Sequence, residues 1–138
     1  MTSVNISWHD AAHTILYTEY DGVWTWDDFH NAVTETVAIM QQVDYRVDLI
    51  VAPSPQSVMP HGSASPHFIW AIQMLPPNFG IQVIVTHNRL SRSMGSIFVK
   101  VFRRMFRERL FFATNMEQAY ALIMKHREAK QPELSTLE

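Results

Sequence analysis

The sequence predicts a single α/β domain with a mixed, mostly parallel sheet of about five strands and four helices. Two observations predict this class. Continuous apolar runs, typical of strands buried on both faces, alternate with segments of helical periodicity, and the resulting element order is ββαβαβαβα. The 138 residues suit one domain, because a chain of this length buries roughly two-thirds of the surface that it exposes when unfolded. We expect the domain to span residues 1–127, followed by a flexible tail over residues 128–138.

A β-hairpin is expected at the N-terminus. Apolar and polar residues alternate over residues 4–9 with the period of two that marks a half-buried strand. Residues 14–20 are rich in β-branched and aromatic side chains, and the short connection between the two runs favours antiparallel pairing. The hairpin is predicted to bury Trp8 or Tyr17 beside Phe29 of the helix that follows.

The first helix has a start signal and a clear apolar face. Thr25 is predicted as its N-cap, with Asp28 three residues later in a capping box. From Phe29 to Met40, the inward-facing residues recur at offsets of +3, +4, +7, +8 and +11, and all but Thr36 are apolar. The nearly uninterrupted apolar run 47–52 then predicts a strand with both faces covered.

A loop and a second helix come next. Prolines and a glycine over residues 52–62 exclude regular structure there. Ser65 is predicted as the N-cap of the second helix, with Pro66 at its first position. Residues 81–86 form another apolar run and predict a further buried strand.

The end of the chain predicts a helix, a short strand and a last helix. Residues 88–109 have helical periodicity, and residues 110–113 predict a strand. Thr114 and Glu117 are predicted as the capping box of the last helix.

Positive charge gathers on one side of the segment 88–109, which holds seven of the 11 Lys and Arg residues of the chain. At about 100° per residue, five of them share one face: Arg89, Arg92, Lys100, Arg103 and Arg107. This face indicates either a solvated surface or a docking surface for an acidic protein or an anionic membrane. Nucleic acid is not an expected partner, because the net charge of the whole chain is −2.

Polar residues that follow two predicted strands form the candidate ligand site. His61, Ser63, Ser65 and His87 are expected near the carboxyl ends of the strands, where open α/β sheets bind ligands. The group suggests a small-ligand or phospho-acceptor site, with a hydrolase as the alternative. No acidic residue is placed to orient a histidine, and no HExxH or G-x-S-x-G motif is present. We therefore predict no catalytic residue, no metal and no cofactor.

Other side-chain classes receive simpler interpretations. The tryptophans and phenylalanines are assigned mainly to core packing, because no basic residue is interleaved with them. Acidic residues of the first half are assigned mainly to turns and helix starts: Asp21, Asp27, Asp28, Asp44 and Asp48. The aromatic and methionine content leaves a homodimer open, since large exposed apolar patches usually mark contact surfaces.

The composition also bounds the class of protein. The absence of cysteine excludes disulfides, thiol nucleophiles and cysteine-ligated metals. No signal peptide is visible, and no apolar run approaches the ~20 residues of a transmembrane helix. A cytoplasmic location is therefore expected.

Four segments carry a resemblance to a known family: the hairpin that ends at Asp21-Gly22, the helix start 25–29, the strand 46–51 and the helix start 114–119. Over roughly residues 4–127 the chain resembles the STAS-like domains related to bacterial anti-sigma-factor antagonists, and most of all a branch of small uncharacterised bacterial proteins. The resemblance implies a non-enzymatic regulatory or protein-interaction module. In STAS phospho-switches a serine in an Asp-Ser-Ser-Gly-like turn opens the helix after the third strand. Here that turn is Pro60-His61-Gly62-Ser63-Ala64-Ser65, which keeps serines but lacks the aspartate.

Overall fold

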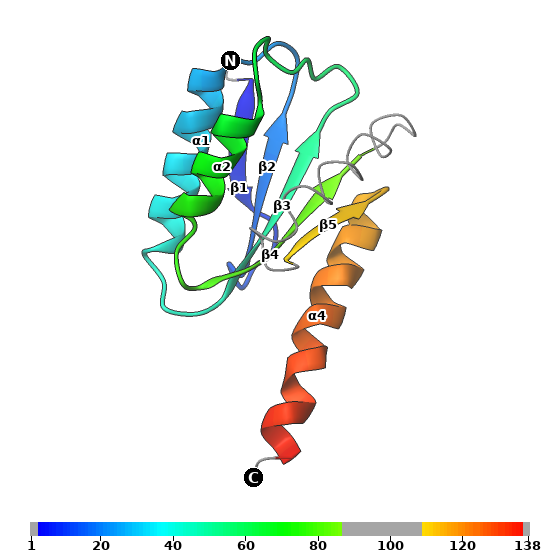
Figure 1. The fold of residues 1–138 in the computed structure, drawn as a ribbon. Helices are drawn as coiled ribbons and strands as arrows, with labels where there is room; N and C mark the ends of the chain where they lie inside the picture. Colours follow the sequence, from blue (N-terminus) through cyan, green and yellow to red (C-terminus); the bar gives the residue numbers. More distant parts are fainter. Residues whose placement is uncertain (1–2, 87–108, 137–138) are drawn as a thin grey trace.

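The computed structural model describes residues 3–86 and 109–136, which form one five-stranded sheet with helices on both faces (Figure 1). The strands are β1 (Val4–Trp8), β2 (Ile15–Tyr20), β3 (Val47–Pro53), β4 (Phe79–Val85) and β5 (Leu110–Ala113). They lie in the order β1-β2-β3-β4-β5; β1 is antiparallel to β2, and the other neighbours are parallel. The predicted mixed, mostly parallel five-stranded sheet is confirmed.

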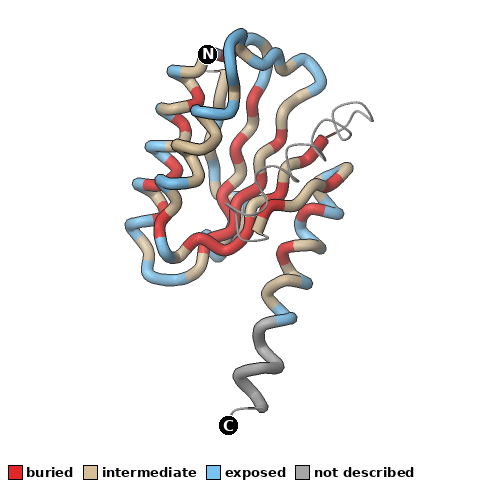
Figure 2. The backbone as a smooth tube through the Cα atoms, in the orientation of Figure 1, coloured by how far each residue is buried: buried red, intermediate tan, exposed pale blue. Residues whose placement is uncertain are grey.

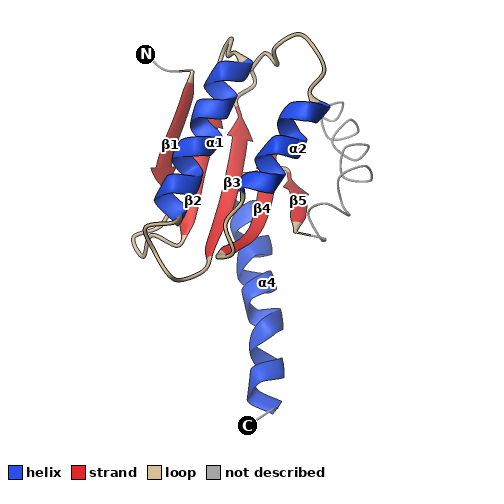
Figure 3. Cartoon of the chain, turned by 60° about the vertical axis from the view of Figure 1, so that its left-hand side comes forward, coloured by secondary structure: helices blue, strands red, loops and turns tan. Residues whose placement is uncertain are grey.

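The described residues contain three helices: α1 (Trp26–Met40), α2 (Ser65–Met74) and α4 (Met116–Thr136). Helices α1 and α2 cover one face of the sheet and α4 covers the other (Figure 3). The fourth predicted helix lies, apart from Arg109, outside the described residues. The predicted tail 128–138 is helical as far as Thr136, and its flexibility stays a prediction.

The hairpin between β1 and β2 forms as predicted, with Val4 opposite Tyr20 and Trp8 opposite Leu16. Its turn is held by Asp10, whose carboxylate accepts hydrogen bonds from the backbone N–H groups of Thr14 (2.8 Å) and Ile15 (3.0 Å) and from the Thr14 hydroxyl. Partial burial acts to raise the pKa of Asp10, but these hydrogen bonds outweigh it and leave the pKa below its ordinary value.

The sequence predicted that Trp8 or Tyr17 of the hairpin packs beside Phe29, and this prediction is wrong: the hairpin residue beside Phe29 is Tyr20. Side chains alternate across a strand, so Tyr20 faces α1 while Tyr17 joins the cluster under α4. Helix α1 runs back along the sheet, which places Phe29 beside Tyr20 at 6.5 Å between ring centroids. Trp8 of β1 lies at the turn end of the hairpin, away from Tyr20, and packs against the cluster that contains Met40.

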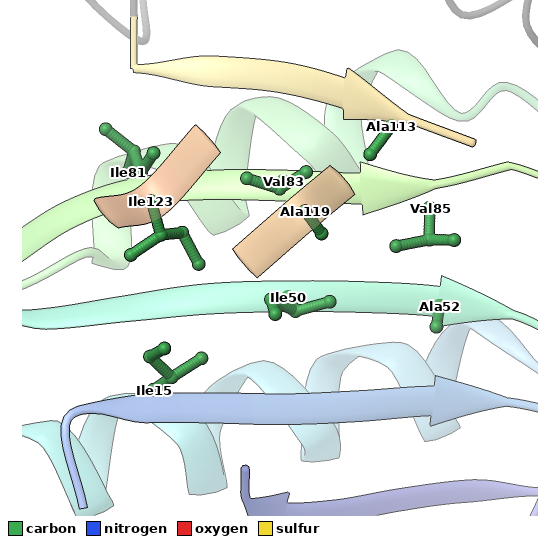
Figure 4. Close-up of a cluster of buried hydrophobic side chains, with 9 residues drawn as sticks. All are labelled: Ile15, Ile50, Ala52, Ile81, Val83, Val85, Ala113, Ala119 and Ile123. Atoms are coloured by element: carbon green, nitrogen blue, oxygen red, sulfur yellow. The ribbon is translucent and has the colours of Figure 1, made fainter. Parts of the chain in front are cut away.

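The core under α4 is made by the apolar runs that predicted β3 and β4 (Figure 4). Ala119 and Ile123 of α4 lie over Ile50 of β3 and Val83 of β4. All four side chains are completely buried. Because α1 and α2 cover the other face, these strands have no solvent-facing side, which explains their continuous apolar sequence.

The helix starts agree with the sequence for α1 and differ by one residue for the other two. The Thr25–Asp28 capping box of α1 is confirmed, with its two hydrogen bonds at 2.9 and 3.0 Å. The N-cap of α2 is Ala64 rather than Ser65, and its side chain makes no cap hydrogen bond. Pro66 still lies in the first turn, where its missing N–H has no helical partner to lose.

The start of α4 is also shifted by one residue from the predicted box of Thr114 and Glu117. The helix begins at Met116, and Asn115 Oδ1 accepts from the Gln118 N–H at 2.7 Å. The Gln118 side chain in turn accepts from the backbone N–H of Thr114 at 2.7 Å. An Asn–Gln pair thus takes the place of the predicted Thr–Glu box, one residue later.

The buried phenol of Tyr20 should make the folded protein less stable at alkaline pH. It is 6% exposed, and burial raises its pKa far above the ordinary value of about 10, so above that pH the unfolded state loses the phenolic proton while the folded state keeps it. The free energy of unfolding should therefore fall as the pH rises above ~10, by up to about 1.4 kcal/mol per pH unit from this group. Urea denaturation between pH 9 and pH 11.5 measures the slope, which should flatten in Tyr20→Phe. Equal slopes in the two proteins would contradict the prediction.

Candidate functional site

The connections at the carboxyl ends of β2 and β3 form a fixed surface, at the top of the sheet in Figure 1. Val23 and Val58 pair in a parallel bridge, and the Val58 N–H donates to the Gly22 carbonyl at 2.8 Å. Gly22 has a φ of 63°, in the left-handed region that favours glycine, which lets the chain turn from β2 towards α1. The predicted loop 52–62 is therefore tied to the segment that follows β2.

Side-chain hydrogen bonds also anchor the loops that follow β2 and β3. The indole N–H of Trp24 donates to the Ser57 hydroxyl at 2.9 Å, and that of Trp26 donates to the His61 carbonyl at 2.9 Å. The Ser54 hydroxyl donates to the Asp21 carboxylate. Trp24 is 7% exposed and packs with Tyr20 and Phe29, so its ring belongs to the core while its polar tip holds the loop.

Three apolar side chains project from this anchored frame. Val23 is 75% exposed, Val58 52% and Met59 51%. We call Val23, Val58 and Met59 the loop-edge patch; Figure 2 shows that the loops beyond these strand ends are largely exposed. Since Val23 and Val58 are paired and both loops are held by hydrogen bonds, these three exposed side chains form a surface of fixed shape.

The structure describes three of the four predicted ligand-site residues. His61, Ser63 and Ser65 are all exposed; His61 and Ser63 lie in the turn before α2, and Ser65 is the first residue of α2. His87 lies outside the described residues, so its approach to His61 stays a prediction. The docking residues Arg89, Arg92, Lys100, Arg103 and Arg107 lie outside them as well.

A histidine pair between α1 and α2 was missed by the sequence interpretation. His30 Nε2 and His67 Nδ1 lie 2.8 Å apart, in hydrogen-bond contact. Trp26 stacks on His67 and Trp70 on His30, each with ring centroids 4.1 Å apart. One imidazole must donate and the other accept, so the bond requires at least one neutral ring. No group of three or more metal-ligating residues occurs in residues 3–86 and 109–136.

A buried ionic cluster was missed too, and the assignment of Asp48 to a turn or helix start is wrong. Asp48 lies within β3 and is completely buried. Its Oδ1 accepts from Arg46 Nε at 3.0 Å and from the Ile81 N–H at 2.8 Å. Its Oδ2 accepts from Arg127 Nε at 2.7 Å, and Arg127 Nη2 also donates to the Thr14 carbonyl at 3.1 Å. One carboxylate therefore joins β3, β4 and α4.

Local backbone geometry makes room for this carboxylate. The β3–β4 register shifts between the Val47–Phe79 and Leu49–Gln82 pairs, so that Gly80 and Ile81 lie opposite Asp48. A Cβ on Gly80 would lie 2.0 Å from Asp48 Oδ1 and 2.2 Å from Arg46 Nε, so a larger residue does not fit. The sequence signals were an aspartate and a glycine within two mainly apolar strands.

Comparisons of the chain with protein-family models, curated proteins and solved structures found no match. Within residues 3–86 and 109–136, no helix is both long and apolar enough to cross a membrane.

Proposed function

We propose that this domain is a non-catalytic regulatory or protein-interaction module resembling STAS domains, and that it docks a protein partner on the loop-edge patch. The observation that carries the proposal is the exposure of Val23, Val58 and Met59 on loops fixed by hydrogen bonds. An apolar surface held in one conformation loses little conformational entropy when it binds. The N-terminal hairpin and the alternation of strands and helices, on which the resemblance rests, support the same class.

The regulatory part of the proposal concerns Ser63 and Ser65. Both side chains are exposed, and both belong to the segment that leads from the patch into α2. A phosphate on either serine would add a charge of roughly −1.5 to −2 near an apolar contact surface. We propose that such a modification weakens docking, because a partner that covers the patch must desolvate that charge.

Site-specific photo-crosslinking in the source cells tests the docking surface. Val58→p-benzoyl-L-phenylalanine should yield a discrete crosslinked product, and Glu35→p-benzoyl-L-phenylalanine, at an exposed position on α1, serves as the matched control. Replacing Val23 and Met59 by serine should reduce the product at least ~5-fold without unfolding the domain, since both residues are exposed. A product of twice the chain mass would identify a homodimer. Equal crosslinking at positions 58 and 35, or none at 58, would refute the docking surface.

The same assay tests the serines. Ser63→Asp/Ser65→Asp should lower the yield at position 58, while Ser63→Ala/Ser65→Ala should keep it. Equal yields from the two double variants would show that charge at these serines does not regulate docking.

A further inference from the structure

A second surface lies at the opposite edge of the sheet, at the amino ends of β2 and β3 (the lower end in Figure 1). An open hollow of about 480 Å³ is lined there by Ala12, Thr14, Tyr45, Arg46 and Arg127. Three separate parts of the chain build it: the hairpin turn, the segment before β3, and α4. We propose that this hollow binds a small organic anion through a phosphate or carboxylate group.

The charge balance of the buried cluster supports an anionic ligand. Two guanidinium groups face one carboxylate, that of Asp48, so the cluster carries a net charge of +1 before His126 is considered. Arginine stays protonated at all ordinary pH values, so this excess is permanent. None of the five described residues that line the hollow is acidic. The nearby Asp10 already accepts hydrogen bonds from Thr14 and Ile15 in the hairpin turn.

Each guanidinium also keeps donors for a ligand. Arg46 uses Nε and Nη2 on Asp48, and its Nη2 also donates to His126 Nδ1 at 3.0 Å. Arg127 uses Nε and Nη2 on Asp48 and on the Thr14 carbonyl. Within the part of the chain that the structure describes, neither Nη1 group has a hydrogen-bond partner, and the two side chains are 28% and 25% exposed.

Two fixed guanidiniums are suited to an oxyanion. Because both are held by one carboxylate, they repel each other, and an anion that bridges their Nη1 groups relieves that repulsion. The buried Asp48 carboxylate fixes the orientation of both guanidinium groups, so the two arginine side chains lose little conformational freedom when an anion binds.

Tyr45 indicates that the anion is part of an organic molecule. Its side chain is 41% exposed and lies on the wall of the hollow next to Arg46. Its hydroxyl donates to the His13 carbonyl at 3.0 Å, and its own carbonyl accepts from Asn78 Nδ2 at 3.0 Å, so both ends of the residue are fixed. The ring offers a flat face to a cyclic or aromatic ligand body whose anionic group lies at the arginines.

The probes are inorganic phosphate, phenyl phosphate and benzoate, titrated against chloride at constant ionic strength and pH 7. NMR of the arginine Nε–Hε signals should show saturable shifts for Arg46 and Arg127, while the signal of Arg109, outside the lining, stays in place. Phenyl phosphate should bind ~3–10-fold more tightly than inorganic phosphate if it stacks on Tyr45. Tighter binding by benzoate than by phenyl phosphate would identify a carboxylate ligand, and the reverse a phosphate ligand.

Variants separate the site from general charge attraction. Arg46→Lys keeps the positive charge but loses the paired donors of the guanidinium group, and should weaken phosphate binding ~10-fold. Tyr45→Ala should remove the advantage of phenyl phosphate and leave inorganic phosphate unchanged. Lys125→Gln, which removes an exposed charge on α4 outside the lining, is the matched control and should bind as wild type does. If Arg46→Lys does not fold, Tyr45→Ala still provides the test, because Tyr45 lies outside the core and is 41% exposed. The proposal would be overturned if neither the phosphates nor benzoate bound better than chloride, or if Lys125→Gln lost as much binding as Arg46→Lys.

Discussion

Replacing Asp48 by alanine should lower the free energy of unfolding by about 3–5 kcal/mol, the range measured when one partner of a buried ion pair is removed. The variant leaves Arg46 and Arg127 facing each other without their shared carboxylate and leaves the Ile81 N–H without its acceptor. Urea denaturation followed by circular dichroism gives the difference. A loss of this size is a large share of the roughly 5–15 kcal/mol that stabilises a typical domain.

Asp44→Ala is the matched control for this measurement. Asp44 precedes β3 and is exposed, so its removal should change the free energy of unfolding by no more than ~0.5 kcal/mol. A cost below about 1 kcal/mol for Asp48→Ala would mean that the arginines find other partners and that the carboxylate does not organise the cluster.

The second large effect is expected at Gly80. An alanine Cβ there would approach Asp48 Oδ1 to 2.0 Å and Arg46 Nε to 2.2 Å, well inside contact distance. Either the carboxylate must leave its hydrogen bonds or β4 must move away from β3. We expect Gly80→Ala to cost about 3 kcal/mol or more, at or above the upper end for overpacked sites.

Two further variants separate crowding from backbone effects. Gly22 has a φ of 63°, and no atom lies within 4 Å of the position that a Cβ would take there, so Gly22→Ala should cost only the roughly 1–2 kcal/mol of a left-handed residue. In an Asp48→Ala background the carboxylate is gone and the Arg46 side chain, no longer held by it, can move away, so adding Gly80→Ala should cost much less than in wild type. Additive effects of the two substitutions would show that they act independently.

The sequence predicted those elements whose cause is local. The capping box of α1 needs only Thr25 and Asp28, and the buried strands β3 and β4 follow from nearly continuous apolar runs. The starts of α2 and α4 were each misplaced by one residue: α2 begins after Ala64, which has no polar side chain to mark it, and α4 is capped by Asn115 rather than by its polar neighbour Thr114. The predicted α/β class is therefore correct although two helix starts were misplaced by one residue.

The polar clusters could not be predicted because their members are far apart in the chain. Asp48 and Arg127 are separated by 79 residues, and His30 and His67 by 37. Their contacts depend on strand register and on the packing of α1 against α2, which no local pattern specifies. The loop-edge patch has the same origin, since the parallel bridge between Val23 and Val58 joins two loops that follow different strands.

The hydrogen bond from Arg127 to the Thr14 carbonyl spans 113 residues, and this separation constrains how the protein is made. A ribosome delivers the hairpin, β3 and β4 long before it adds Arg127. Until then the partners of Asp48 among the described residues are Arg46 and the Ile81 N–H, and Ala119 and Ile123 do not yet cover the apolar surface of β3 and β4. A sheet that forms before α4 is translated would therefore lack the cover of α4 on one face and expose apolar surface to other proteins. Its last interactions form only when the final helix has been translated.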